Sequence, residues 1–72
     1  MNALVQYLYL DGQRVRVSSS SLSTINGRTG RIVRQTEGNT PPLPMYLVEI
    51  DGLSIGPWKL YESEIAPAGS AS

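Results

Sequence analysis

The chain contains no cysteine and no histidine among its 72 residues. Their absence excludes disulfide bridges, zinc sites of ordinary composition, and the Ser-His-Asp and Cys-His arrangements of many hydrolases. A domain of this length buries only about 60% of the surface that its unfolded chain exposes, and such domains often depend on disulfides, metals or partner subunits. Because two of these three supports are missing, we expect a homo-oligomer or a subunit of a larger assembly.

Long apolar runs are also missing. No run reaches the roughly 18 residues that a membrane-spanning helix needs, and no basic residue precedes the apolar residues at the start of the chain. We therefore expect no signal peptide, no membrane span and no membrane partner. The lack of cysteine fits a reducing compartment, so the expected location is the cytoplasm.

The formal net charge is zero, because six basic residues balance six acidic ones, but the two signs are separated along the chain. Residues 12–36 contain five arginines and no acid, whereas residues 37–72 contain Lys59 and five acids. Such asymmetry is typical of a nucleic-acid patch or of a head-to-tail subunit contact. The alternative is that these charges lie on solvated strand faces and pair across the sheet.

Alternating polar and apolar residues predict short strands, and no segment of ten or more residues has the 3.6-residue period of a long helix. The predicted strands are residues 13–17, 31–35, 45–50 and a return strand within 53–61, with a last strand residue at Ile65. The side chains expected to face the core are Val15, Val17, Ile32, Tyr46, Val48, Ile50, Trp58 and Leu60.

Turn residues separate these strands. Asp11-Gly12 suits a type I′ hairpin, and Asn-Gly at 26–27 and Asp-Gly at 51–52 also predict turns. Gly30 predicts a bulge or a close backbone approach. Residues 36–44 hold three prolines and are expected to form a loop, and residues 62–64 suffice for one helical turn.

The start of the chain has two interpretations. Residues 4–10 form an N-terminal strand that pairs through the Asp11-Gly12 turn, or they form an extension that docks elsewhere. Both faces of such a strand are apolar, and a domain this small cannot easily cover them, so the segment is the best candidate for a subunit interface. The predicted interface residues are Leu4, Tyr7, Leu8, Tyr9 and Leu10.

Four segments form an ordered series: GQRVRV at 12–17, NGRTGRIV at 26–33, YLVEI at 46–50 and WKLYESEI at 58–65. The series resembles the SH3-like small barrels, which include KOW-type domains, a barrel protein of photosystem I and the plasmid-borne type II dihydrofolate reductases. The resemblance implies an all-β domain, a single SH3-like barrel of five to six short antiparallel strands. It divides the chain into an N-terminal strand or extension (1–11), the barrel (12–66) and a flexible tail (67–72).

The reductases are the only enzymes among these families. They are similar in the arginine-bearing first strand and in a Val-Gln-Ile-Tyr stretch that lines a pore at the centre of a tetramer. Here that stretch reads Trp58-Lys59-Leu60-Tyr61, so a bulky indole and a cation stand where the reductases have a small side chain and an amide. The indole would fill such a pore or the lysine would change its charge, so we expect that this chain is not an enzyme.

Other motifs point to chemistry only weakly. Glu62 and Glu64 could form a carboxylate pair, but acids beside a terminal turn are far more often solvated, so no catalytic residue is assigned. Residues 41–44 satisfy P-x-x-P, which suits either an SH3 or WW ligand or a stiff loop. Nothing in the sequence indicates a metal site or a cofactor.

Three functions follow, in decreasing order of support. The first is a non-catalytic binding or assembly module for a protein partner or for a second copy of the chain. The second is an RNA- or DNA-binding module, and the third is a small-molecule enzyme with a site at an oligomer centre. The residues expected to contact nucleic acid or another ligand are Arg14, Arg16, Arg28, Arg31, Arg34, Lys59 and Tyr61.

Overall fold

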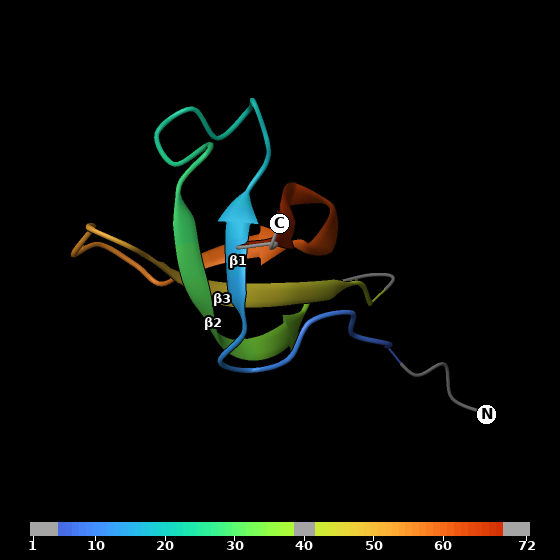
Figure 1. The fold of residues 1–72 in the computed structure, drawn as a ribbon. Helices are drawn as coiled ribbons and strands as arrows, with labels where there is room; N and C mark the ends of the chain where they lie inside the picture. The colour runs from blue at the N-terminus through green and yellow to red at the C-terminus, as the bar shows by residue number, and fades with distance from the viewer. Residues whose placement is uncertain (1–4, 39–41, 69–72) are drawn as a thin grey trace.

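A computed structural model describes residues 5–38 and 42–68, which form one antiparallel sheet and one short 3-10 turn (Figure 1). The elements are β1 (Arg14–Val17), β2 (Thr29–Glu37), β3 (Pro44–Ile50), β4 (Trp58–Tyr61), η1 (Glu62–Glu64) and β5 (Ile65–Pro67). The strand order in the sheet is β4-β3-β2-β1-β5. The predicted small all-β domain of five to six short antiparallel strands is therefore confirmed, with five strands.

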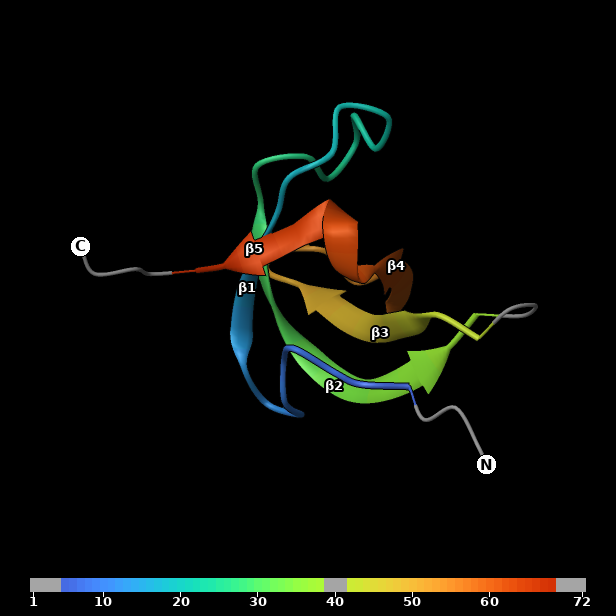
Figure 2. The same cartoon turned by 90° about the vertical axis from the view of Figure 1, so that its right-hand side faces the viewer.

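The sheet is curved but open. Its two edges are β4 and β5, which do not pair with each other in the described part of the chain, and η1 connects them (Figure 2). Strand β2 pairs with β1 near its start and with β3 along its length, and the β2–β3 register shifts between Ile32 and Arg34. Such a bulge increases local bend and twist, so β2 wraps around the core.

Gly30 lies where three strands are closest. It stands between Val15 of β1 and Ile50 of β3, and a Cβ atom added to it would overlap the carbonyl oxygen of Glu49. The predicted close backbone approach at Gly30 is confirmed, and the bulge lies further along β2, at Val33.

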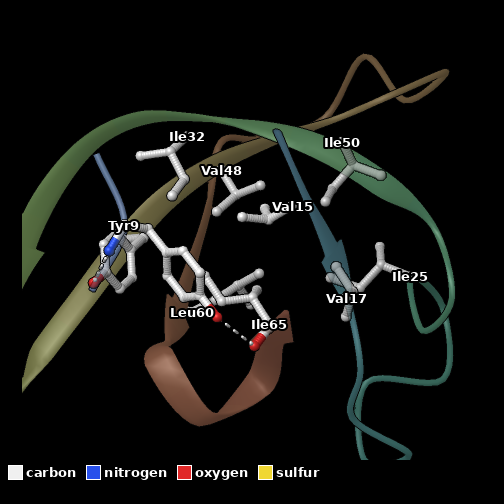
Figure 3. Close-up of a cluster of buried hydrophobic side chains, with 10 residues drawn as sticks. Tyr9, Val15, Val17, Ile25, Ile32, Val48, Ile50, Leu60 and Ile65 are labelled. Atoms are coloured by element: carbon white, nitrogen blue, oxygen red, sulfur yellow. Dashed lines mark hydrogen bonds between the residues drawn. The ribbon is translucent and has the colours of Figure 1, made fainter. Parts of the chain in front are cut away.

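Side chains from every strand, from the segment before β1 and from the β1–β2 loop form one apolar core (Figure 3). The alternation in β1 and β3 buries the predicted residues. Trp58, which was also predicted to face the core, is only half-buried and packs against the core from the edge strand β4. The buried cluster consists of Tyr9, Val15, Val17, Ile25, Ile32, Tyr46, Val48, Ile50, Leu60 and Ile65.

The turn before β1 differs from the prediction. A type I′ turn needs positive φ at both central residues, but among the described residues only glycines have positive φ. Gly12 has φ 86°, Asp11 does not, and the Gln13 amide donates to the Leu10 carbonyl at 3.0 Å. The type I′ prediction is wrong because no strand precedes Asp11 among the described residues, so the turn does not have to match the twist of a hairpin.

Strand ends also differ by a few residues. The predicted loop at 36–44 is shorter, because β2 continues to Glu37 and β3 begins at Pro44, a first strand position that proline tolerates. The predicted flexible tail begins within β5, which ends at Pro67, and the Ala68 amide donates to the Arg14 carbonyl at 3.2 Å. Residues 69–72 lie outside the described residues.

Residues 5–10, here called the arm, form no strand, so the strand prediction is wrong for them and the extension interpretation holds. Leu4 lies outside the described residues. The arm runs along the bulged part of β2 (Figure 2) and leads into the Asp11-Gly12 turn, where the Gly12 amide donates to the Ile32 carbonyl at 2.7 Å.

Candidate functional site

The Tyr46 hydroxyl is the main anchor of the arm. Tyr46 is fully buried, and its oxygen accepts hydrogen bonds from the backbone amides of Leu8 (3.0 Å) and Tyr9 (3.2 Å). The hydroxyl donates to a carboxylate oxygen of Glu62, which also accepts from the Leu8 amide at 2.9 Å. Burial and the bond to Glu62 raise the pKa of Tyr46, so the hydroxyl keeps its proton at neutral pH.

Side chains complete the attachment of the arm. The rings of Tyr7 and Tyr9 both meet Tyr46 edge to face, with centroids 5.7 and 5.6 Å away. The Tyr7 hydroxyl donates to the Thr36 carbonyl at 2.6 Å, and the Gln35 side-chain amide donates to the Tyr9 carbonyl at 2.8 Å. The arm is thus tied to β2, β3 and η1 without joining the sheet.

The predicted interface residues separate into two groups. Tyr9 is only 5% exposed and belongs to the core, and Tyr7 is half-buried against it. Leu8 and Leu10 are 69% and 67% exposed. The chain therefore covers the tyrosine side of the arm itself and leaves the leucine side to solvent.

A shallow cleft of about 300 Å³, here called the Tyr61 cleft, opens beside the arm. Its lining residues are Leu43, Pro44, Tyr61, Glu62 and Ser63, contributed by the start of β3, the end of β4 and η1. Leu43 and Tyr61 are each 45% exposed. Because Glu62 both lines the cleft and accepts the Leu8 amide, the backbone of the arm at Leu8 lies beside one wall of the cleft.

The charged residue that lines the Tyr61 cleft is acidic. Glu62 lies in its wall, and Glu64 of the same turn accepts the Tyr61 amide at 2.8 Å. Glu37 stands opposite Pro44 in the β2–β3 register. Among the described residues, no lysine or arginine lines the cleft; Lys59 lies outside it, two residues before Tyr61 on β4.

A second, polar groove of about 460 Å³ lies between the outer sheet surface and residues 53–56 of the β3–β4 loop. Arg14, Arg31, Glu49 and Asp51 contribute its charged wall. Asp51 accepts hydrogen bonds from both terminal nitrogens of Arg14 and, at 2.7 Å, from the Thr29 hydroxyl. The charges in this groove are thus largely satisfied by one another.

These contacts make stability depend on pH. The hydrogen bonds from Arg14 and Thr29 lower the pKa of Asp51 in the folded protein. A lowered folded pKa stabilises the fold above the unfolded pKa of about 3.9, and that stabilisation is lost as the pH falls through the folded pKa. Asp51→Asn should therefore melt below the parent at pH 7, and the gap should close as the pH falls below about 4.

The matched control is Arg14→Gln, which removes the other partner of the same pair. It should show the same pH-dependent gap, and the double variant should add little, because both substitutions remove one interaction. Thermal melts at a series of pH values measure this. A gap that stays constant or widens in acid would contradict the assignment.

All residues predicted to contact nucleic acid or another ligand are exposed. Two of these residues pair with acids across the sheet, as the alternative to a nucleic-acid patch predicted. Arg14 pairs with Asp51, and Arg31 lies 3.9 Å from Glu49. Arg16 donates to the Gly27 carbonyl at 2.9 Å. Tyr61 lines the cleft, on the same strand and face as Lys59.

Two structural features are absent over residues 5–38 and 42–68. No helix there is long and apolar enough to cross a membrane. These residues also contain no group of three or more acidic, histidine or cysteine side chains placed to hold a metal ion.

The sequence missed the anchoring role of Glu62 and the existence of the cleft. Glu62 reads as one more solvated acid, and no sequence signal links it to Tyr46 or to the arm. The cleft had a partial signal, since the P-x-x-P motif at 41–44 supplies Leu43 and Pro44, although Pro41 lies outside the described residues.

Comparisons of the chain with protein-family models, curated proteins and solved structures found no match. The function is therefore inferred from the residues of the chain itself.

Proposed function

We propose that the protein is a non-catalytic binding module, and that the Tyr61 cleft together with Leu8 takes up an apolar segment of a protein partner that also carries basic residues. The observation that carries this proposal is the junction at Glu62, which lines the cleft and binds the backbone of the arm at Leu8, a residue whose side chain is exposed. The relation to SH3-like barrels remains part of the proposal, supported by the five short antiparallel strands over residues 14–67.

The apolar surface has the composition of a protein contact. Tyrosine is enriched among the residues that contribute most binding energy, and a partly exposed ring beside proline and leucine offers a flat apolar platform. Tyr61 and Leu43 are partly exposed and line the cleft. Ile55 is 74% exposed on the β3–β4 loop and does not line it. A cleft that already exists lowers the cost of ordering upon binding.

Charge decides the kind of partner. Glu62 and Glu64 favour a basic segment and oppose an acidic one, since complementary potentials raise association rates and like charges suppress wrong partners. A second copy that docked through the same surface would bring Glu62 of each copy together. A basic segment of another protein therefore fits better than a symmetric dimer.

The test uses a short synthetic peptide of leucine, proline and arginine. In one control peptide glutamate replaces arginine, and in the other serine replaces leucine. We expect the first peptide to cause saturable NMR shifts at the amides of Leu8, Tyr61 and Ser63, and the other two to cause much smaller ones. Tyr61→Ala should weaken binding about tenfold, the loss typical of an aromatic contact residue.

The control variant is Ile55→Ala, which removes an equally apolar side chain away from the cleft and should leave the affinity unchanged. Equal shifts with the arginine and glutamate peptides, or none with any peptide, would rule out the proposed partner. A solution mass that shows a dimer, and a monomer after Tyr61→Ala, would instead identify the cleft as a contact between copies.

A further inference from the structure

The sheet gathers most of the positive charge of the protein on its outer face, the side away from the core. Alternation in β1 buries Val15 and Val17 and turns Arg14 and Arg16 outward. Arg31 of β2 lies directly opposite Arg14 in the register, and residues paired in this way point to the same side of a sheet.

The bulge in β2 extends this surface. After Val33, Arg34 pairs with Leu47 of β3, and Leu47 in turn pairs with Lys59 of β4. A regular strand would have turned Arg34 to the core side, since it is three residues from Arg31. The outer face thus carries five of the six basic residues: Arg14, Arg16, Arg31, Arg34 and Lys59.

Few acids share this face. Glu49 lies on it opposite Arg31, and Asp51 follows at the end of β3, so five cations meet two carboxylates and three positive charges remain in excess. In the part of the chain that the structure describes, neither Arg34 nor Lys59 pairs with a carboxylate. The other four acids lie before β1, at the end of β2 and on η1, although the whole chain is neutral.

The layout of these charges indicates the class of ligand. The cations are spread over three strands and do not converge on one point, which suits a chain of anionic groups better than a single small anion. Arginine, with its planar fork of donors, pairs well with phosphate. Half-buried Leu47 and bulged Val33 lie between the cations, and the exposed ring of Tyr61 stands past Lys59 at the end of β4. The described face thus lacks the apolar centre of a protein interface and the row of stacking groups that holds successive bases.

We propose that the outer face of the sheet binds the phosphate backbone of nucleic acid without reading the base sequence, with Arg34 and Lys59 as its main contacts. Arg14 and Arg31 contribute less because Asp51 already engages the Arg14 guanidinium and Glu49 lies 3.9 Å from that of Arg31. This surface is distinct from the Tyr61 cleft and meets it only at the end of β4. Its occupation neither requires nor excludes a protein partner in the cleft.

The test measures fluorescence anisotropy of a labelled 20-nucleotide DNA single strand and of its duplex at several salt concentrations. We expect dissociation constants of about 1–100 µM at physiological salt, the range of sequence-independent binding, tighter binding at low salt, and equal values for two unrelated sequences. Arg34→Gln combined with Lys59→Gln should weaken binding at least tenfold and reduce the log–log salt slope by about 2, because two phosphate contacts are lost.

The matched control is Ser20→Glu combined with Ser23→Glu, which lowers the net charge by the same amount on the β1–β2 loop, beyond the other end of β2 (Figure 1). Both positions are exposed, and the control should bind within about threefold of the parent. Absence of binding by the parent at low salt, an equal loss in the control, or affinity that follows base sequence would overturn the proposal. Thermal melts of each variant confirm that the fold is retained.

Discussion

Replacing Tyr9 with alanine should lower the free energy of unfolding by about 3–5 kcal/mol, the usual cost of removing a large buried aromatic side chain. Tyr9 is 5% exposed, packs against Tyr46 and lies within the main core cluster. A domain of this size has a total stability of roughly 4–11 kcal/mol, so the substitution removes a large part of it. Urea unfolding followed by circular dichroism measures the change.

The matched control is Leu8→Ala, one residue earlier in the arm. Leu8 uses its backbone amide to reach Tyr46 and Glu62, and its side chain is 69% exposed, so the substitution should change stability by less than about 0.5 kcal/mol. If both variants are as stable as the parent, the arm does not contribute to the core in solution.

Gly30→Ala should be the second strongly destabilising substitution, with a loss of about 3 kcal/mol, at the upper end of what overpacking costs. The new methyl group would overlap the backbone carbonyl of Glu49, which cannot turn aside as a flexible side chain can. The strands on both sides of Gly30 would have to separate, at the point where Val15 and Ile50 flank it.

Gly38→Ala provides the comparison for Gly30→Ala. A Cβ atom at Gly38 would approach the Met45 sulfur at 3.2 Å, and a methionine side chain can move by a few tenths of an ångström. Melting temperatures of the two variants should therefore differ by more than about 10 °C. Similar melting temperatures would mean that β2 and β3 are further apart at Gly30 than the structure has them.

The sequence predicted the strands well where burial alternates. Val15 and Val17 of β1 and Val48 and Ile50 of β3 are all buried. In each strand the apolar residues alternate along the chain, so they all point to the face that packs on the core. Such a pattern depends on the local period of the chain and needs no knowledge of distant residues.

The arm shows where local patterns fail. Its apolar composition resembles a strand, but its amides at Leu8 and Tyr9 donate to the side-chain oxygens of Tyr46 and Glu62. The polar groups of the backbone are therefore satisfied without a neighbouring strand. The partners lie 37–54 residues away, and no local pattern in residues 5–10 identifies them.

The candidate sites were predictable to different degrees. The arginines and Lys59 were identified from charge alone, but the structure places Arg28 before β2, and Arg34 reaches the outer face only because of the bulge at Val33. The Tyr61 cleft depends on the β2–β3 loop and η1 meeting in space, which sequence cannot show. Tyr61 was assigned to a ligand surface, and the structure adds Leu43 and Pro44 beside it.

The attachment of the arm also has a consequence for folding kinetics. The hydrogen bonds from Leu8 to Glu62 and from Tyr9 to Ile65 join residues 54 and 56 positions apart in a chain of 72. Contacts this distant raise the relative contact order, and small β proteins with high contact order fold in milliseconds to seconds, far more slowly than helical proteins of equal size. The attachment of the arm is complete only when η1 and β5 are in place, and a nascent chain lacking Glu62 would leave part of the arm open to other apolar surfaces.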